Sequence, residues 1–318
     1  MKLFQALLVV TTVILLYIPT FQVEQVSSRP TSVDSLFQQT TSAQSPSPDS
    51  LQKSFERAVW SNDTKRLKEL ITAGVDVNHI NKADGYAALH WAVERRLTQT
   101  VRVLLEHGAD IDLMTSNAIG NDRTALHIAA ELGHPDIVRI LLDQGADVHQ
   151  KTIYGESALH GVRLFVKNKE VVRQLIEAGV DVNAVTEFGT TPLHAASLLG
   201  STQIVDLLIE NGAGINLPNK RGMAPLHNAA QNGHLEVINK LLAADVDINA
   251  QTRTGDTAMH LAAKKGHSEI IRVLLNEGAN PLTLNKFSKS PLSEAQDRAY
   301  DQVVEILSGL TSAEVEEG

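Results

Sequence analysis

The chain has 318 residues, with 37 Asp and Glu against 28 Lys and Arg, a formal net charge of −9 at pH 7, and no cysteine. The lack of cysteine excludes disulfides, thiol nucleophiles and thiolate zinc sites. The acidic balance argues against a nucleic-acid partner. Local basic pairs are flanked by acidic or neutral residues, and we expect them to be ordinary solvated surface; they are Arg95-Arg96, Lys220-Arg221 and Lys264-Lys265.

The N-terminus is hydrophobic. Lys2 precedes an apolar run over residues 3–18, which as a helix would span about 24 Å, less than the roughly 30 Å core of a bilayer. We interpret residues 1–23 either as a signal peptide, cleaved near Val26–Ser28, or as an uncleaved signal anchor forming a single transmembrane helix. Both interpretations place the rest of the chain outside the cytoplasm, in a periplasmic, secreted or luminal location.

Residues 24–50 are rich in Ser, Thr, Gln and Pro, a composition that cannot bury a core, and they are predicted to be a disordered linker. Shortly after the linker, Asn62-Asp63-Thr64 is the sole N-x-[ST] sequon. It permits glycosylation in a eukaryotic secretory pathway. The favoured alternative is that Asn62 closes one helix in the left-handed conformation and Asp63 caps the next.

From residue 87 onward one four-residue phrase recurs six times. Its histidines lie 37, 33, 34, 33 and 33 residues apart, and such a period predicts a solenoid of stacked supersecondary units. The copies are Ala87-Ala88-Leu89-His90, Thr124-Ala125-Leu126-His127, Ser157-Ala158-Leu159-His160, Thr191-Pro192-Leu193-His194, Ala224-Pro225-Leu226-His227 and Thr257-Ala258-Met259-His260.

Residues 222–255 show the local structure of one unit. Pro225 suits the first turn of a short helix that Gly233 ends, and a second amphipathic helix is predicted from about His234 to Ala243. The alternating residues 246–249 predict a brief extended segment. Neither helix is long enough to be stable alone, so each unit depends on its neighbours.

The phrase, the period and a recurring closing phrase such as Gly74-Val75-Asp76-Val77-Asn78 are similar to the ankyrin repeat. The resemblance covers roughly residues 51–310 and implies an all-α repeat solenoid of about eight stacked ankyrin repeats, each a helix-turn-helix with a short finger loop. The first and last repeats would be caps. Residues 311–318 would form an acidic tail.

The resemblance implies a non-enzymatic protein-protein interaction scaffold with a protein partner and no cofactor. Residues 1–23 add the expectation that this scaffold is exported or membrane-tethered. Catalytic motifs such as H-E-x-x-H, G-x-S-x-G and the P-loop are absent. In the family the phrase histidine ties neighbouring fingers together, and one histidine per repeat cannot converge on a metal. We expect a monomer. The alternative is a structural or protective envelope component that associates with itself.

In the ankyrin family, partners bind along the finger tips and the exposed side of the first helix, which line a groove. The corresponding aromatic and arginine side chains are typical interface hot spots, although rings at fingers also pack finger against finger. The predicted partner-binding residues are Tyr86, Arg95, Arg123, Glu131, Leu132, Tyr154, Phe165, Phe188, Leu199, Arg221, Met223, Lys264 and Phe287.

Two departures from the period bear on shape. Four extra residues within 116–123 predict one longer finger, and insertions of this kind often lie on the binding face. The fourth repeat carries Gly161, Val162 and Val166 in place of the usual small residues and an extra residue near 167–169. We interpret this region either as a break or hinge in the groove or as a partner contact.

Overall fold

The computed structural model describes residues 47–116, 122–161 and 169–316. Across these ranges the chain is all helical, with sixteen helices and no strand. They form eight pairs: α2 (Pro48–Trp60) with α3 (Thr64–Thr72), α4 (Ala88–Glu94) with α5 (Thr98–Glu106), α6 (Ala125–Leu132) with α7 (Pro135–Asp143), α8 (Ala158–Gly161) with α9 (Lys169–Glu177), α10 (Pro192–Leu199) with α11 (Thr202–Glu210), α12 (Pro225–Asn232) with α13 (Leu235–Leu242), α14 (Ala258–Ala263) with α15 (Ser268–Asn276), and α16 (Pro291–Gln296) with α17 (Asp301–Glu316).

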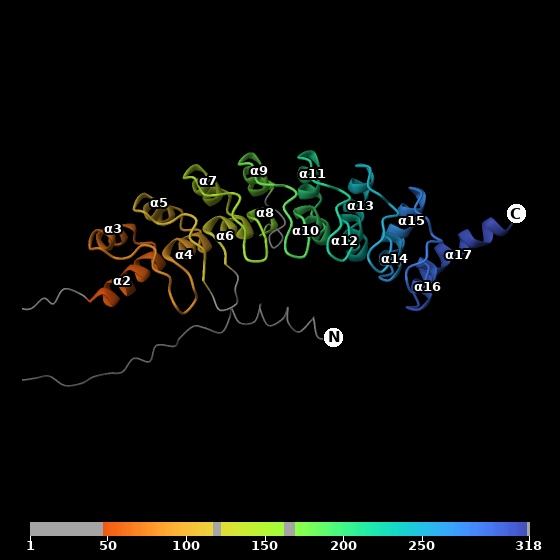
Figure 1. The fold of residues 1–318 in the computed structure, drawn as a ribbon, viewed down its shortest axis with the longest axis horizontal. Helices are drawn as coiled ribbons and strands as arrows, with labels where there is room; N and C mark the ends of the chain where they lie inside the picture. The colour runs from red at the N-terminus through yellow and green to blue at the C-terminus, as the bar shows by residue number, and fades with distance from the viewer. Residues whose placement is uncertain (1–46, 117–121, 162–168, 317–318) are drawn as a thin grey trace, which may run out of the picture. The chain divides into compact units, whose positions relative to one another are not determined.

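The pairs stack in chain order, and each contacts its neighbours (Figure 1). First helices pack on first helices, as α10 does on α12 and α12 on α14, and second helices pack on second helices, as α11 does on α13. A single apolar core therefore runs through the stack, built from the buried face of every helix. This confirms the predicted all-α solenoid of about eight repeats, in which stability is shared between nearest neighbours.

Two predicted segments lie largely outside the described residues. They are the hydrophobic segment 1–23 and the linker 24–50 up to residue 46. In the part of the chain that the structure does describe, no helix combines the length and the apolar character needed to cross a membrane.

The unit at residues 222–255 shows how the sequence forms each repeat. As predicted, α12 begins at Pro225 and ends at Gly233, whose φ of +81° is left-handed, and α13 follows directly after His234. The predicted extended segment 246–249 is wrong. Asp247 Oδ1 accepts a hydrogen bond of 3.1 Å from the Asn249 N–H, and this Asx turn replaces an extended backbone.

The phrase histidines are buried bridges between successive repeats. His194 Nδ1 accepts from the Thr191 N–H at 3.2 Å, and its Nε2 lies 2.8 Å from the Met223 carbonyl in the next finger. His90 joins its own first turn to the Leu113 carbonyl in the same manner. This arrangement requires a neutral ring with the proton on Nε2, and it confirms the structural role predicted for these histidines.

The closing phrases form a second series of links on the opposite end of each unit. Asn78 Oδ1 accepts from the Asp110 N–H at 2.8 Å, and Asn249 Oδ1 accepts from the Asn280 N–H at 2.9 Å. The two residues of each bond lie about one period apart in the sequence. The asparagine that ends one closing phrase therefore holds the backbone of the next closing phrase. The sequence shows this phrase as a repeat signature without revealing the bond.

The ends of the repeat array differ from the predicted boundaries. Residues 48–50, predicted as linker, are the first turn of α2, because Ser47 caps the helix and Pro48 occupies its first position. At the other end, α17 continues to Glu316, through most of the segment 311–318 predicted as a tail. The repeat array is therefore longer at both ends than the phrase alone indicates.

Asn62 and Asp63 take the favoured of the two roles considered for the sequon. Asn62 has φ +54°, and Asp63 caps α3 by accepting from the Arg66 N–H at 2.9 Å. The Asn62 side-chain oxygen also accepts a hydrogen bond of 2.7 Å from the Thr100 hydroxyl in the next repeat. The local turn and a contact between repeats therefore both use this asparagine.

The bridges make stability depend on pH. Burial lowers the pKa of His90 and of His127 to about 4, below the ordinary 6.5. The unfolded chain thus binds protons that the folded chain does not, and stability falls as pH drops from about 6.5 towards 4. We expect urea unfolding at pH 5 to show a loss of roughly 2 kcal/mol for each of these histidines relative to pH 7.

The matched variants are His127→Gln and His149→Gln. His149 is exposed. The first should reduce the difference between pH 7 and pH 5 by about 2 kcal/mol, because glutamine does not titrate, and the second should leave it unchanged. An unchanged difference in His127→Gln would contradict the assignment.

Candidate protein-binding surface

The predicted partner-binding residues lie on the fingers and first helices. In Figure 1 the first helices from α4 to α16 form one row with the fingers beside them, and the second helices from α3 to α15 form the other row. The structure therefore confirms that both kinds of predicted position belong to one side of the repeat. The structure also divides the predicted residues into two groups. In one group the side chains bind other side chains of this molecule, and in the other they are exposed to solvent.

Single backbone hydrogen bonds join the tips of neighbouring fingers. The Glu187 N–H donates to the Tyr154 carbonyl at 2.7 Å, and the Lys220 N–H donates to the Phe188 carbonyl at 2.9 Å. The same bond recurs between later fingers. Side chains that are far apart in the sequence are thereby placed side by side along the line of tips.

At the N-terminal end of this surface, three predicted residues bind one another. Arg123 forms an ion pair with Glu131, and its guanidinium donates to the Tyr86 hydroxyl at 3.1 Å. Both charged side chains are only 19% exposed. Burial raises the pKa of the Tyr86 phenol, with Arg123 acting in the opposite direction. This cluster links α6 and two fingers, and its polar groups are largely occupied.

The predicted residue Lys264 belongs to a second internal cluster near the C-terminal end. Its ammonium lies 2.7 Å from Asp256 and 3.4 Å from Glu294, whose side chains are buried. Asn285 donates to both carboxylates, and Arg298 pairs with Glu294 at 2.6 Å. Burial would raise the pKa of Asp256, but hydrogen bonds led by Lys264 lower it. Lys264 thus holds α14 to the last repeat.

Part of the surface between these two charged clusters is apolar and open. Phe188 is 64% exposed at a finger tip, and Tyr154 occupies the preceding tip. Leu198 and Leu199 are exposed at the end of α10, in the repeat whose finger tip carries Phe188. Among the residues that the structure describes, no side-chain hydrogen bond or ion pair engages these four side chains.

The remaining predicted residues have separate environments. Phe287 is 66% exposed and Arg221 is exposed, whereas Met223 is half-buried and Leu132 packs partly against the core. Phe165, the rest of the irregular stretch 162–168 and most of the inserted loop (117–121) lie outside the described residues. The interpretations of those two segments therefore stay predictions.

Sequence reasoning missed Trp60, an exposed aromatic residue at the end of α2. It is 48% exposed, and the predicted residue Arg95 stacks over it with the guanidinium carbon 4.5 Å from the ring centroid. Trp91 lies behind it, with the two ring centroids 6.0 Å apart. The first repeat carries no T-P-L-H phrase, so the alignment that placed the other residues could not reach Trp60.

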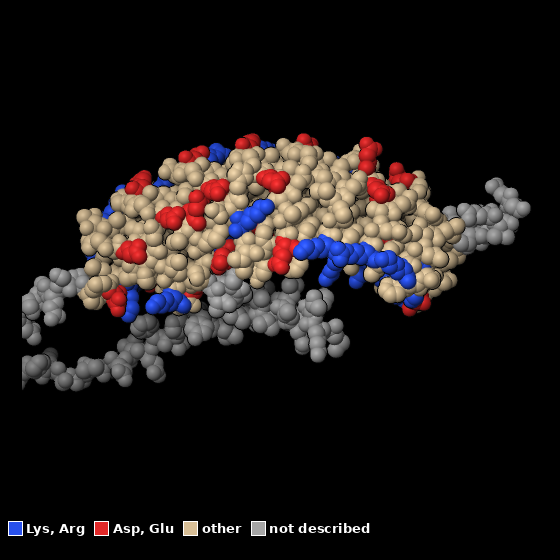
Figure 2. All heavy atoms as spheres, in the orientation of Figure 1, with Lys and Arg blue, Asp and Glu red and all other residues tan. Residues whose placement is uncertain are grey.

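Charged groups are unevenly spread over this face. Figure 2 shows a band of Lys and Arg atoms over the part of the molecule that carries α12 to α16, while Asp and Glu atoms are scattered elsewhere. The sequence gives only separated pairs there, such as Lys220-Arg221. The folded chain brings them together because finger tips of successive repeats lie next to one another.

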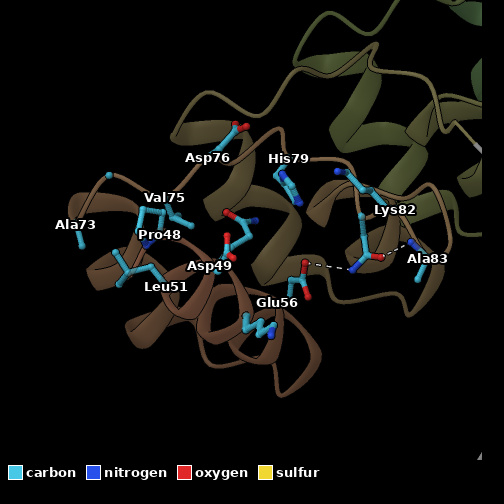
Figure 3. A pocket seen from close by; sticks show the side chains of 14 residues that line it. Pro48, Asp49, Leu51, Glu56, Ala73, Val75, Asp76, His79, Lys82 and Ala83 are labelled. Carbon is cyan, nitrogen blue, oxygen red and sulfur yellow. Dashed lines mark hydrogen bonds between the residues drawn. The ribbon is translucent and has the colours of Figure 1, made fainter. Parts of the chain in front are cut away.

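A hollow lies at the N-terminal end of the repeat array. It has a volume of about 720 Å³ and lies between α2 and the loop after α3, lined by Leu51, Glu56, Val75 and His79 among others (Figure 3). Glu56 accepts from the Asn81 amide at 3.2 Å inside it. A preceding repeat would stack on this end of the array. Among the residues that the structure describes none stacks there, and polar groups such as Glu56 line this end, as predicted for a cap.

The described residues contain no group of three or more His, Cys, Asp or Glu side chains that could hold a metal ion. The phrase histidines use both ring nitrogens in the bridges between repeats.

The family model for ankyrin repeats (3 copies) matches residues 55–152, 159–252 and 239–316. These matches cover most of the chain, and the protein belongs to the ankyrin repeat family. Ankyrin repeats generally mediate protein-protein interaction, and proteins built from them are typically non-enzymatic scaffolds.

Curated relatives match over short segments. A segment of 65 residues is 37% identical to Ankyrin repeat domain-containing protein 40 of Mus musculus and of Homo sapiens, covering 20% of this chain and 18% of each relative. A segment of 60 residues is 47% identical to Potassium channel AKT1 of Oryza sativa subsp. indica, covering 19% of this chain and 6% of the channel. The chain thus matches less than a fifth of the length of these relatives.

The internal role of Arg123 can be measured against the open arginine at a later finger. We expect Arg123→Ala to lower the free energy of unfolding by about 1 to 3 kcal/mol, because it leaves Glu131 and the Tyr86 hydroxyl unpaired in a partly buried site. Arg221→Ala should change it by less than about 0.5 kcal/mol, since Arg221 is exposed. A loss of less than about 0.5 kcal/mol for Arg123→Ala in urea unfolding would contradict its internal role.

Proposed function

We propose that this chain is a non-enzymatic scaffold that is exported from the cytoplasm and binds a protein partner across the middle of its finger and first-helix surface. The observation that carries the proposal is the open apolar group Tyr154, Phe188, Leu198 and Leu199, flanked by two clusters whose charges are paired internally. A partner that covers this group removes apolar surface from water without leaving a buried charge unpaired.

The magnitudes support a specific interaction. Burying a large apolar side chain completely contributes about 1.5 to 3 kcal/mol, and these four residues are between 37% and 64% exposed. Their burial would therefore contribute several kcal/mol in total. Aromatic residues at the centre of an interface commonly supply most of the binding energy, and Phe188 is the most exposed of the four.

The proposed location follows from the N-terminal sequence. The apolar segment 1–23, with Lys2 before it, supports export either as a signal peptide or as a signal anchor. In the second case residues 24–46 would tether the repeat array to the membrane. The partner would then be a periplasmic, secreted or luminal protein, or the exposed part of a membrane protein.

The binding proposal is tested by photocrosslinking at position 199 in cells that express the full chain natively, followed by affinity measurement with the purified crosslinked partner. Phe188→Ser with Leu198→Ser should weaken that affinity at least tenfold, because two exposed anchors are lost. Leu282→Ser is the matched control, since Leu282 is also exposed but lies in a closing phrase rather than on a finger tip or first helix. It should change the affinity by less than about threefold.

Two results would contradict the binding proposal. One is equal weakening by the control variant. The other is crosslinking only to a second copy of this chain together with concentration-dependent sedimentation, which would favour the alternative of a self-associating envelope component.

Export is tested separately by the intact mass and the membrane fractionation of the natively expressed chain. A soluble exported chain that begins near Arg29 would establish a cleaved signal peptide, and a full-length chain in the membrane fraction would establish an anchor. A soluble full-length chain in the cytosol would refute export and leave the binding proposal intact.

A further inference from the structure

The finger tips of the last four fingers form a continuous line of mostly basic side chains. The line runs Phe188, Lys220, Arg221, Arg253, Thr254, Lys286 and Phe287, and all seven residues are exposed. We call these residues the tip row. Its members come from four separate repeats, and none of its cations has an ion-pair partner among the residues that the structure describes.

Backbone hydrogen bonds set the order of the tip row. The Lys220 N–H donates to the Phe188 carbonyl, the Arg253 N–H to the Arg221 carbonyl and the Lys286 N–H to the Thr254 carbonyl, each at 2.9 Å. Each step of the tip row from one finger to the next is therefore a hydrogen-bonded pair of residues. The remaining steps join residues that are consecutive in the chain.

Glycines hold the fingers at this spacing. Gly222, with φ +74°, lies so close to the next finger that an added Cβ would be 2.6 Å from the Arg253 nitrogen. An added Cβ at Gly255 would be 2.9 Å from the Lys286 nitrogen. No other residue fits either position without moving backbone. The cations of the tip row are therefore presented by a rigid backbone, which lowers the entropy cost of binding.

We propose that the tip row binds an extended acidic segment of the partner protein, with apolar residues at both ends of that segment. Two steps along the chain of about 3.8 Å and two across fingers of about 4.8 Å separate Lys220 from Lys286, about 17 Å in all. An extended peptide covers that distance with about five residues at about 3.4 Å each. Phe188 and Phe287 stand at the two ends and meet the apolar flanks of the segment.

The charge pattern favours a short peptide over a larger polyanion. The whole chain carries a net charge of −9, and Figure 2 shows Asp and Glu atoms scattered over the same face of the molecule. A nucleic acid or an anionic bilayer would bring its charge against these carboxylates as well. Glu187 also lies directly before Phe188, where a peptide can place a neutral or basic residue and a uniform phosphate surface cannot.

This inference rests on the proposed protein-binding function and names the chemistry of the segment that is bound. The probe is a fluorescent peptide of five consecutive glutamates between two leucines, and its binding to the full chain is followed by anisotropy. The same peptide with glutamines is the ligand control. Binding of the glutamate peptide should weaken as ionic strength rises from about 0.01 M to about 0.15 M, where the Debye length falls from about 30 Å to about 8 Å.

Two variants with the same change in net charge separate the tip row from general electrostatics. The first reverses the four cations of the tip row to glutamate at positions 220, 221, 253 and 286. The second reverses four exposed cations on the outer second helices, Lys65, Lys68, Arg102 and Arg272. The first variant should bind the peptide at least tenfold more weakly, and the second should bind it less than about threefold more weakly, once both retain the wild-type helix content.

Three outcomes would overturn the inference. They are equal loss in the two variants, equal binding of the glutamate and glutamine peptides, and tighter binding of a DNA duplex or a phosphatidylserine vesicle than of the peptide. If the partner crosslinked at position 199 binds the tip-row variant as tightly as the wild type, the proposed function stands and this inference fails.

Discussion

The bridge made by each phrase histidine is the interaction on which the stack depends. A neutral imidazole has one acceptor and one donor, and the repeat uses both, the first towards its own first turn and the second towards the next finger, as His260 does with Thr257 and Lys289. One ring therefore fixes both the start of a helix and the distance to the following unit. Because the Nδ1 lone pair is already occupied and the rings lie one repeat apart, the same geometry leaves no nitrogen for a metal.

The positions four residues before and after this histidine face each other, and the repeats use that pair in different ways. Arg123 pairs with Glu131 at one end of the array, and Asp256 pairs with Lys264 towards the other. In the fifth and sixth repeats the equivalent positions are uncharged, Thr190 with Leu198 and Met223 with Gln231, and Leu198 is exposed. An ion pair therefore holds this position near the two ends of the array, and no charged pair takes its place in these two repeats.

The sequence predicts what repeats and misses what only stacking creates. The period and the helices follow from the phrase, because each rests on residues close together in the chain, whereas the role of the histidine follows from the resemblance to the ankyrin repeat. The exposed state of Phe188 and the engaged state of Lys264 do not, since neighbours one repeat away decide them. Ser47, Pro48 and Asp49 are ordinary helix-start signals that indicate the start of α2. They lie within a segment whose composition favours a linker. Trp60 could not be assigned to the surface from the sequence, because the first repeat lacks the four-residue phrase on which the other repeats are aligned.

Recognition and stability are placed on different residues of the same finger. The glycine after each tip, as at Gly222 and Gly255, has a left-handed φ and contacts the next finger, so the stack constrains it. The two tip residues before that glycine form the link through backbone atoms only, and their side chains point away from the core into solvent. Any side chain can occupy a tip without altering the hydrogen bond that aligns it. A row of four cations can thus form on an acidic protein at little cost in folding.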